Sequence, residues 1–115
     1  RENDSVDLFH KTKLSFYKFY LKNILFFISN LHTPIPCIAG TYSAYIDPYG
    51  NVYPCTQWSL ILGNINERSF REIWWCEKAK HVRINIRKSY CPGCWTPCEA
   101  QLSWIMNLGM LRSLW

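Results

Sequence analysis

The sequence lacks a long apolar run, a secretory signal and a concentrated block of one charge. Lys18, Lys22 and Asn23 interrupt the most apolar stretch, so no 18 consecutive apolar residues occur and no membrane span is expected. The first residues also lack the charged start, short apolar core and small-residue cleavage site of a signal peptide. We therefore expect a cytoplasmic protein.

Thirteen basic residues outnumber eight acidic ones, but the basic residues are scattered. Their densest run, Lys78 to Lys88, is typical of a solvated helix face and loop, and no stacked-aromatic motif accompanies it. We therefore expect no nucleic-acid partner. No acid–base pair or nucleophile constellation stands out either, so whether the chain is an enzyme stays open at this stage.

The length of 115 residues suits one domain, and the chain starts with Arg1. We expect it to be a fragment of a longer protein. Aromatic residues make up 17% of the sequence and include six tryptophans, which is more flat apolar surface than a small core easily buries. Part of this surface is expected to face another domain or a partner.

The chain pattern predicts an α+β fold. Apolar residues recur at helical spacing from Leu8 to Leu31, on nearly all faces, which is typical of a helix covered on two sides. β-formers at 41–46 and 52–53 flank turn residues 47–51 and predict a β-hairpin. A turn is expected at 62–65, a helix from Asn66 or Ser69 to about 80–82, irregular chain at 83–90, and a helix over 99–115.

Five of the six cysteines fall in predicted loops, namely Cys37, Cys55, Cys91, Cys94 and Cys98. Two cysteines separated by two residues can direct both sulfurs at one metal centre, so Cys91 and Cys94 supply half of a four-thiolate site. Cys37 and Cys55 could supply the other half from the two ends of the hairpin segment. Four thiolates suit tetrahedral zinc or a [4Fe–4S] cluster.

Three hypotheses remain for these cysteines, and a [4Fe–4S] cluster is the first. Zinc ribbons use two short cysteine pairs, whereas seventeen residues separate Cys37 from Cys55, which weakens the zinc interpretation without excluding it. A structural zinc module that binds a protein partner is therefore the second hypothesis. A disulfide-stapled secreted domain is the third, and the missing secretory signal disfavours it.

Several segments in order resemble the SPASM/twitch domain, which follows the barrel of many radical S-adenosylmethionine (radical SAM) enzymes. The resemblance covers residues 37–98. It consists of Cys37-Ile-Ala-Gly40, the hairpin ending in Gly50-x4-Cys55, Leu62-Gly-Asn-Ile65 followed by a helix ending in Ile73-Trp74, and Cys91-Pro-Gly-Cys94.

The resemblance implies a hairpin, a helix and a cysteine-rich loop around an auxiliary [4Fe–4S] cluster, flanked by N- and C-terminal helices. It implies residues 1–36 as the end of a missing barrel, 37–98 as the cluster-binding domain and 99–115 as a C-terminal helix. The cluster would assist electron transfer or substrate positioning in the modification of a peptide, protein or metabolite. The barrel would act in cis and would carry S-adenosylmethionine and a second cluster, since its Cys-x3-Cys-x2-Cys motif is absent here.

The resemblance implies Cys37, Cys55, Cys91 and Cys94 as ligands, and it leaves Cys98 as a ligand or a bystander. The chain departs from the family in carrying Glu99-Ala100 where glycines often follow the last loop cysteine. Cys76 is expected inside a helix as a structural thiol. Histidines 10, 32 and 81 are expected to be ordinary surface or core residues. Trp95 could shield the cluster from solvent.

Overall fold

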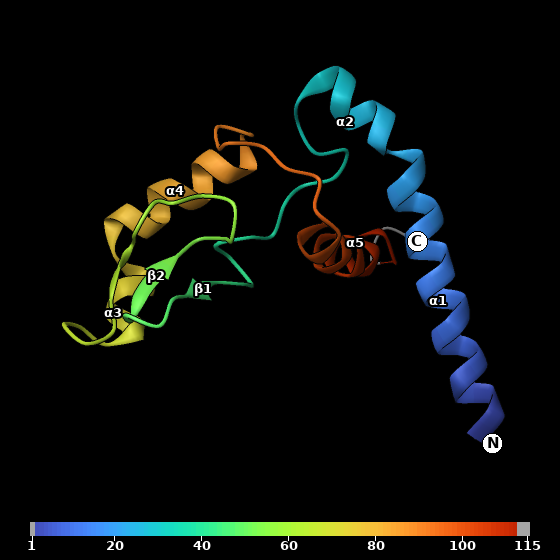
Figure 1. Ribbon diagram of the computed structural model, residues 1–115, viewed down its shortest axis with the longest axis horizontal. Coiled ribbons are helices and arrows are strands. Elements are labelled where there is room, and N and C mark those ends of the chain that lie inside the picture. Colours follow the sequence, from blue (N-terminus) through green and yellow to red (C-terminus); the bar gives the residue numbers. More distant parts are fainter. Residues whose placement is uncertain (1, 113–115) are drawn as a thin grey trace.

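The computed structural model describes residues 2–112, with side chains described for residues 4–107. It confirms the predicted α+β class. The elements, in chain order, are α1 (Glu2–Lys22), α2 (Ile24–Asn30), β1 (Tyr45–Ile46), β2 (Asn51–Tyr53), β3 (Gly63–Asn64), α3 (Phe70–Trp75), α4 (Glu77–Arg87) and α5 (Pro97–Arg112). Figure 1 shows the sheet with α3 and α4 on one side of the molecule, α1 and α2 on the other, and α5 between them.

The sheet contains the predicted hairpin and one strand that the sequence did not predict. β1 and β2 pair antiparallel with Tyr45 opposite Tyr53, and β2 pairs antiparallel with β3. The predicted turn at 62–65 was wrong, because Gly63 and Asn64 pair with β2 instead. Gly63 allows a close approach of helix α3, since a Cβ there would lie 2.9 Å from Cγ1 of Ile73.

Helix α3 begins at the predicted cap and ends earlier than expected. The Ser69 hydroxyl accepts a hydrogen bond from the backbone N–H of Glu72, and the Glu72 carboxylate accepts one from the backbone N–H of Ser69. This capping box fixes the first turn. Cys76 was predicted inside one helix, but it has extended backbone (φ −67°, ψ 160°) and separates α3 from α4. The two helices together therefore form a bent pair.

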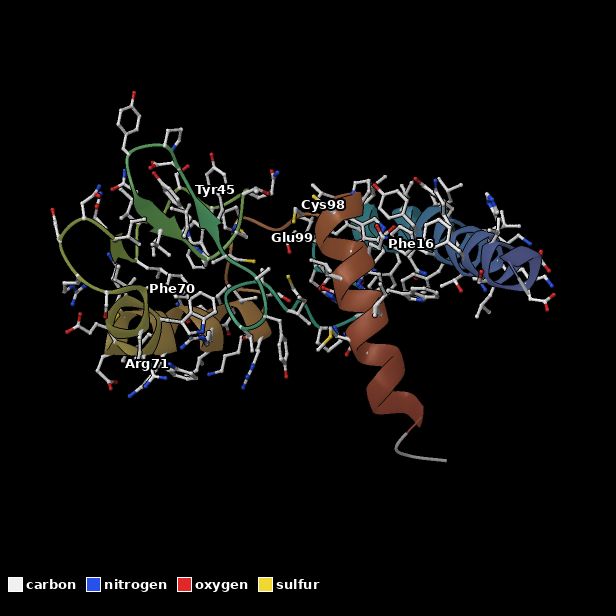
Figure 2. All side chains as sticks on the ribbon, turned by 90° about the horizontal axis from the view of Figure 1, so that it is seen from below. Phe16, Tyr45, Phe70, Arg71, Cys98 and Glu99 are labelled. Atoms are coloured by element: carbon white, nitrogen blue, oxygen red, sulfur yellow. The ribbon has the colours of Figure 1, made fainter. Side chains whose placement is uncertain are left out.

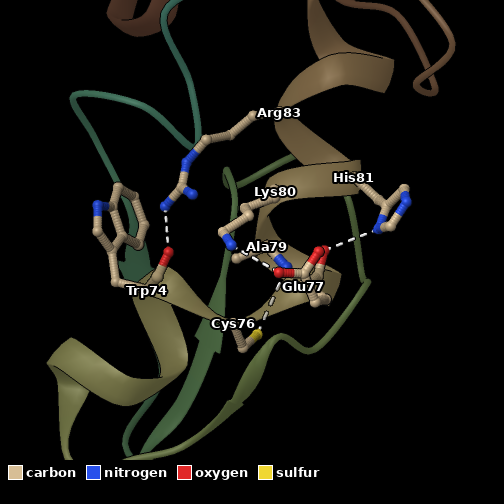
Figure 3. A network of polar contacts seen from close by, with 7 residues as sticks. All are labelled: Trp74, Cys76, Glu77, Ala79, Lys80, His81 and Arg83. Atoms are coloured by element: carbon tan, nitrogen blue, oxygen red, sulfur yellow. Dashed lines mark hydrogen bonds and ion pairs between the residues drawn. The ribbon is translucent and has the colours of Figure 1, made fainter.

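Cys76 begins helix α4 by accepting a hydrogen bond at its Sγ from the backbone N–H of Ala79 (3.5 Å; Figure 3). The helix then continues to Arg87, so the prediction of irregular chain from residue 83 was wrong. Val82 and Ile86 explain the continuation, because both are buried on the face of α4 that packs against the core. Cys76 is thus a structural thiol that caps a helix.

Arg83 joins α4 to Trp74 of α3 (Figure 3) and to Gly40 in the segment that follows Cys37. Its guanidinium donates to the backbone oxygens of Gly40, at 2.6 Å, and of Trp74. The same group lies over the rings of Trp74 and Trp75, 4.6 and 5.3 Å from their centroids. The guanidinium of Arg83 therefore satisfies the carbonyl oxygens of Gly40 and Trp74 and also stacks on two aromatic rings.

The first helix starts earlier than predicted and breaks once. It runs from Glu2 rather than Leu8, and a turn at Asn23 separates α1 from α2. The Asn23 side-chain amide donates to the backbone oxygen of Phe19, which also accepts the backbone N–H of Asn23. Phe16 is the single buried side chain among the described residues of α1 and α2, so cover on two sides stays a prediction about the missing barrel.

Helix α5 begins at Pro97, two residues before the predicted start, where proline fits the first turn. It ends at Arg112 in the described chain, and the predicted continuation to 115 lies outside the described residues. α5 packs against α1. None of the helices in residues 2–112 has both the length and the apolarity to cross a bilayer.

Two separate cores stabilise the chain. An aliphatic core lies between the sheet, α3 and α4 and contains Ala39, Val52, Leu62, Ile73, Ala79, Val82 and Ile86. An aromatic core joins α1, α2 and α5 around Phe16, Trp95 and Ala100. The radius of gyration is 16.3 Å, compared with about 13 Å for a compact domain of this length. The two parts are therefore extended relative to one globule.

Candidate metal centre

Four cysteines from three distant stretches of chain line one cavity. Cys37 precedes the sheet, Cys55 follows strand β2, and Cys91 and Cys94 lie in the loop between α4 and α5. The cavity holds about 500 Å³ of atom-free space, counted out to its open mouth. The four cysteines thus line the wall of a cavity and are not gathered around one point. Within the described residues, no three His, Cys, Asp or Glu side chains are drawn together as a site for one bare ion.

Strand β2 leads the chain to Cys55. The strand ends at Tyr53, and Cys55 follows two residues later in a bend, where it lines the cavity and packs against the aliphatic core. Gly50 permits the sharp turn before the strand, since its φ is +86° and a Cβ there would lie 2.6 Å from the amide of Asn66. A larger residue at 50 would therefore disturb the register that delivers Cys55.

A glycine also shapes the Cys91–Cys94 loop. Gly93 has a φ of +74°, a conformation that side chains other than glycine seldom adopt. This turn brings both cysteines of the pair to the wall of the same cavity. The spacing predicted from the sequence therefore has its expected geometric effect.

Backbone N–H groups lower the pKa of three of the four cysteines. The N–H of Ala39 acts on Cys37, those of Gln57 and Trp58 act on Cys55, and that of Thr96 acts on Cys94. Burial nevertheless dominates and raises the pKa of Cys37 to about 11, while the N–H donors only partly offset it. Burial likewise raises the pKa of Cys55 and of Cys94. Without a bound cation these thiols hold their protons at neutral pH.

The cysteines also lie close enough for the charge on one thiolate to raise the pKa of another. Negative charge on Cys94 and on Cys55 adds to the raised pKa of Cys37, and Cys91 acts in the same way on Cys94. Mutual repulsion of this kind is relieved when a metal cation takes up the thiolate charge and releases the protons. The donor set therefore suits a multivalent metal centre.

Cys98, the fifth predicted site residue, lies apart from this cavity. It is exposed at the start of α5, and its thiol faces the hydroxyl of Thr96 at 3.6 Å (Figure 2). It is absent from the residues that line the cavity. Cys37, Cys55, Cys91 and Cys94 line the cavity and Cys98 does not, so Cys98 as a ligand stays a prediction.

Of the three histidines, only His32 reaches the cavity wall. His10 and His81 lie on the exposed faces of α1 and α4, where His81 contacts the backbone oxygen of Glu77 at 2.9 Å. Trp95 is buried and lines a smaller recess behind Cys37 and Cys94. That it shields a cluster from solvent stays a prediction.

Trp95 also connects the cysteine loop to the helical part. Its ring stacks on Tyr20 at 5.7 Å with an interplanar angle of 11°. The indole N–H donates to the backbone oxygen of Tyr20, and the Tyr20 hydroxyl donates to the backbone oxygen of Trp95. Loop residues 91–96 are thus fixed against α1 by one reciprocal pair.

Glu99 is a cavity residue that sequence reasoning missed. Its side chain is 91% buried, it lines the cysteine cavity, and its Oε2 reaches no hydrogen-bond partner among the described residues. Burial raises the pKa of this carboxyl, and Ser43 offsets the rise only in part. The sequence offered one signal, because Glu99 stands where the resembling family often has glycine.

Comparisons with known proteins identify the family of this domain. Residues 37–99, more than half of the chain, match the SPASM family, described as an iron–sulfur cluster-binding domain. The chain is 42% identical over 38 residues to an AdoMet-dependent heme synthase of Methanosarcina barkeri and 36% identical over 64 residues to one of Nitratidesulfovibrio vulgaris.

Those matches cover 33% and 55% of this chain but only 11% and 17% of the two relatives. The chain therefore corresponds to a small part of each of these proteins. No solved structure gives a significant match. The thiol cavity, the N–H groups around it and the match over residues 37–99 lead to one statement of identity: this chain belongs to the SPASM family of iron–sulfur cluster-binding domains.

Proposed function

We propose that Cys37, Cys55, Cys91 and Cys94 hold one [4Fe–4S] cluster, which serves as an auxiliary cluster in a radical SAM enzyme. The observation that carries this proposal is the single cavity that these four thiols line within a cluster-binding domain. Four cysteine thiolates are the usual ligands of such a cluster. When bound, the cluster supplies a centre that gains or loses one electron.

The surrounding residues have defined tasks in this proposal. The backbone N–H groups of Ala39, Gln57 and Thr96 hydrogen-bond to ligand sulfurs and stabilise their negative charge. Trp95 excludes water from the rear of the site. Together these features orient the thiolates and lower the cost of collecting them in one cavity.

The remainder of the parent would contain a radical SAM barrel, with S-adenosylmethionine and a second cluster. The two heme synthases support this assignment, since their printed name includes AdoMet and this chain covers a small part of them. Exposed apolar residues along α1 and α2, such as Leu21 and Leu25, would contact that barrel. The domain would then relay electrons or position a peptide, protein or small-metabolite substrate in an oxidoreductase.

We place the parent in the cytoplasm. All six cysteines are free thiols in the structure, which suits a reducing compartment.

Metal analysis of the full-length parent tests the ligand set. The protein is purified without oxygen, and iron, sulfide and zinc are measured per chain together with the visible spectrum. We expect Cys55→Ser to lose the iron and sulfide of one cluster, while the barrel cluster is retained. Cys98→Ser is the matched control and should keep the full content, because Cys98 lies off the cavity.

Three results would contradict the proposal. Stoichiometric zinc without the sulfur-to-iron absorption would favour a structural zinc module. Equal losses in Cys55→Ser and Cys98→Ser would remove the assigned ligand set. Unchanged iron in Cys55→Ser would move the cluster away from this cavity.

A further inference from the structure

A second hollow lies beside the cysteine cavity, on the outer side of the hairpin. Tyr45, Asp47, Tyr53 and Trp58 line it together with Cys55, and it is open to solvent. Cys55 also lines the cysteine cavity, so one residue forms a wall of both. The hydroxyl-bearing residues Thr56 and Ser59 complete the rim.

The register of the hairpin brings these side chains to one side. Tyr45 and Tyr53 form a cross-strand pair, and their rings lie 5.6 Å apart at an angle of 35°. Asp47 follows β1 and Cys55 follows β2, and both line the same hollow as the two tyrosines. Figure 2 marks Tyr45 on the hairpin. The hollow is therefore built by the hairpin and the residues that follow its strands.

The hollow carries a fixed negative charge. Desolvation alone would raise the pKa of Asp47, but hydrogen bonds from Asn51, Tyr53 and Tyr49 outweigh it, and the pKa is lowered. Oδ1 accepts from the backbone N–H groups of Tyr49 and Asn51 at 2.9 and 3.0 Å. Oδ2 accepts from the Asn51 amide at 2.9 Å and the Tyr53 hydroxyl at 3.0 Å. The carboxylate is therefore ionised at pH 7 and held in place.

Among the described residues, no positively charged side chain lines this hollow. The chain has a net charge of +5, yet neither lysine nor arginine is among the residues that line this hollow. Tyr45 contacts Tyr53 but remains 42% exposed, so part of its ring is accessible to a ligand. The same hydrogen bond to Asp47 raises the pKa of Tyr53, which keeps that phenol neutral. The hollow thus combines aromatic surface with one anionic group.

We propose that this hollow binds the cationic head of an organic molecule, an alkylammonium or guanidinium group such as that of a lysine or arginine side chain. Cations are attracted to the faces of tyrosine and tryptophan rings, and a carboxylate beside those rings strengthens the attraction. Binding itself needs only the hairpin residues. The consequence that the cation lies next to the cluster ligand Cys55 rests on the proposed function.

Equilibrium binding to the cofactor-loaded full-length parent tests the proposal. The probe is Nα-acetyl-lysine-N-methylamide, and the neutral comparison is Nα-acetyl-norleucine-N-methylamide, both measured by titration calorimetry. We expect the lysine probe to bind and the norleucine probe to bind at least about tenfold more weakly. Tyr45→Leu should weaken lysine binding by about twofold to thirtyfold, the range for the loss of one ring contact.

Tyr49→Leu is the matched control. Tyr49 lies at the tip of the same hairpin, is 79% exposed and does not line the hollow, so its loss should leave the affinity unchanged. Asp47→Asn should weaken binding further than Tyr45→Leu, and circular dichroism checks that the hairpin survives. The proposal fails if the lysine probe does not bind, if norleucine binds equally well, or if Tyr45→Leu binds like the wild type.

These outcomes are independent of the cluster assignment. Loss of lysine binding in a protein with full iron content would overturn the cation site alone. Retained lysine binding in a protein that contains zinc would overturn the cluster alone.

Discussion

The cysteine-bearing part of the chain (the sheet, α3 and α4) and its helical part (α1, α2 and α5) bury their apolar side chains to different extents. The sheet, α3 and α4 enclose an aliphatic core, and Val52 and Ile73 in it are fully inaccessible to solvent. Helices α1 and α2 bury Phe16 but leave large apolar residues exposed, Leu8 at 68% and Leu25 at 74%. The first part is therefore complete as a packed unit, whereas the second presents a surface that another domain can cover.

Truncation of the aliphatic core should have the largest effect on stability. Ile73→Ala removes a fully buried side chain that packs against Gly63. We expect the free energy of opening of β2 and α4 to fall by about 2–5 kcal/mol, since a cavity remains after the substitution. Amide hydrogen exchange of the cofactor-loaded chain measures this opening segment by segment.

The matched control is Leu25→Ala in the helical part. In the isolated chain it should change stability by less than about 0.5 kcal/mol because the side chain is exposed. A larger loss in the full-length parent would show that a partner domain covers Leu25. If Ile73→Ala instead opened α1 as much as α4, the two parts would form one cooperative unit and the contrast drawn above would be wrong.

The cap of helix α3 gives a smaller effect within the cysteine-bearing part. Ser69→Ala removes the hydroxyl that accepts from the Glu72 N–H at 3.3 Å and should cost about 1 kcal/mol. Ser69→Thr keeps a capping hydroxyl and is the control. Denaturant unfolding measures both. An equal loss in the two variants would mean that the hydroxyl is not what stabilises this end of α3.

The sequence predicted local features that depend on a few neighbouring residues. The hairpin turn around Gly50, the Ser69 cap and the grouping of Cys91 with Cys94 all follow from turn, cap and spacing rules. Strand β3 was missed because Gly63 and Asn64 have low strand propensity, and only their pairing with β2 makes them extended. The extension of α4 past Arg83 was missed because burial of Ile86 in the core outweighs the charged neighbours.

Residues whose role depends on distant partners were not predictable in this way. Glu99 reads as an ordinary first-turn acid of α5, and only the fold brings it to the wall of the cavity that Cys37 and Cys55 line. Cys98 shows the converse, because close spacing to Cys94 suggested a shared role and the start of α5 carries it away. Spacing along the chain therefore identifies candidates, while the long-range packing selects among them.

Glu99 lies between the cysteine cavity and the recess that Trp95 lines. Its titration should have the smallest effect on stability, because a buried carboxyl can take up a proton instead of remaining charged. Burial raises its pKa in the folded state above the unfolded value, so the folded state holds the proton more tightly. Stability is then greatest at low pH and falls as pH rises from about 4.3 through the raised folded value. Glu99→Gln abolishes this contribution without changing the shape of the side chain.

We therefore expect wild type to lose stability relative to Glu99→Gln as pH rises above about 4.3, measured by denaturant unfolding of both proteins at each pH. Taking the difference between the two proteins cancels the titration of groups that they share, including the thiols. A parallel pH dependence in both proteins would show that solvent or a neighbouring group satisfies the carboxylate. In that case the junction between the two parts would be wetter than the burial of Glu99 indicates.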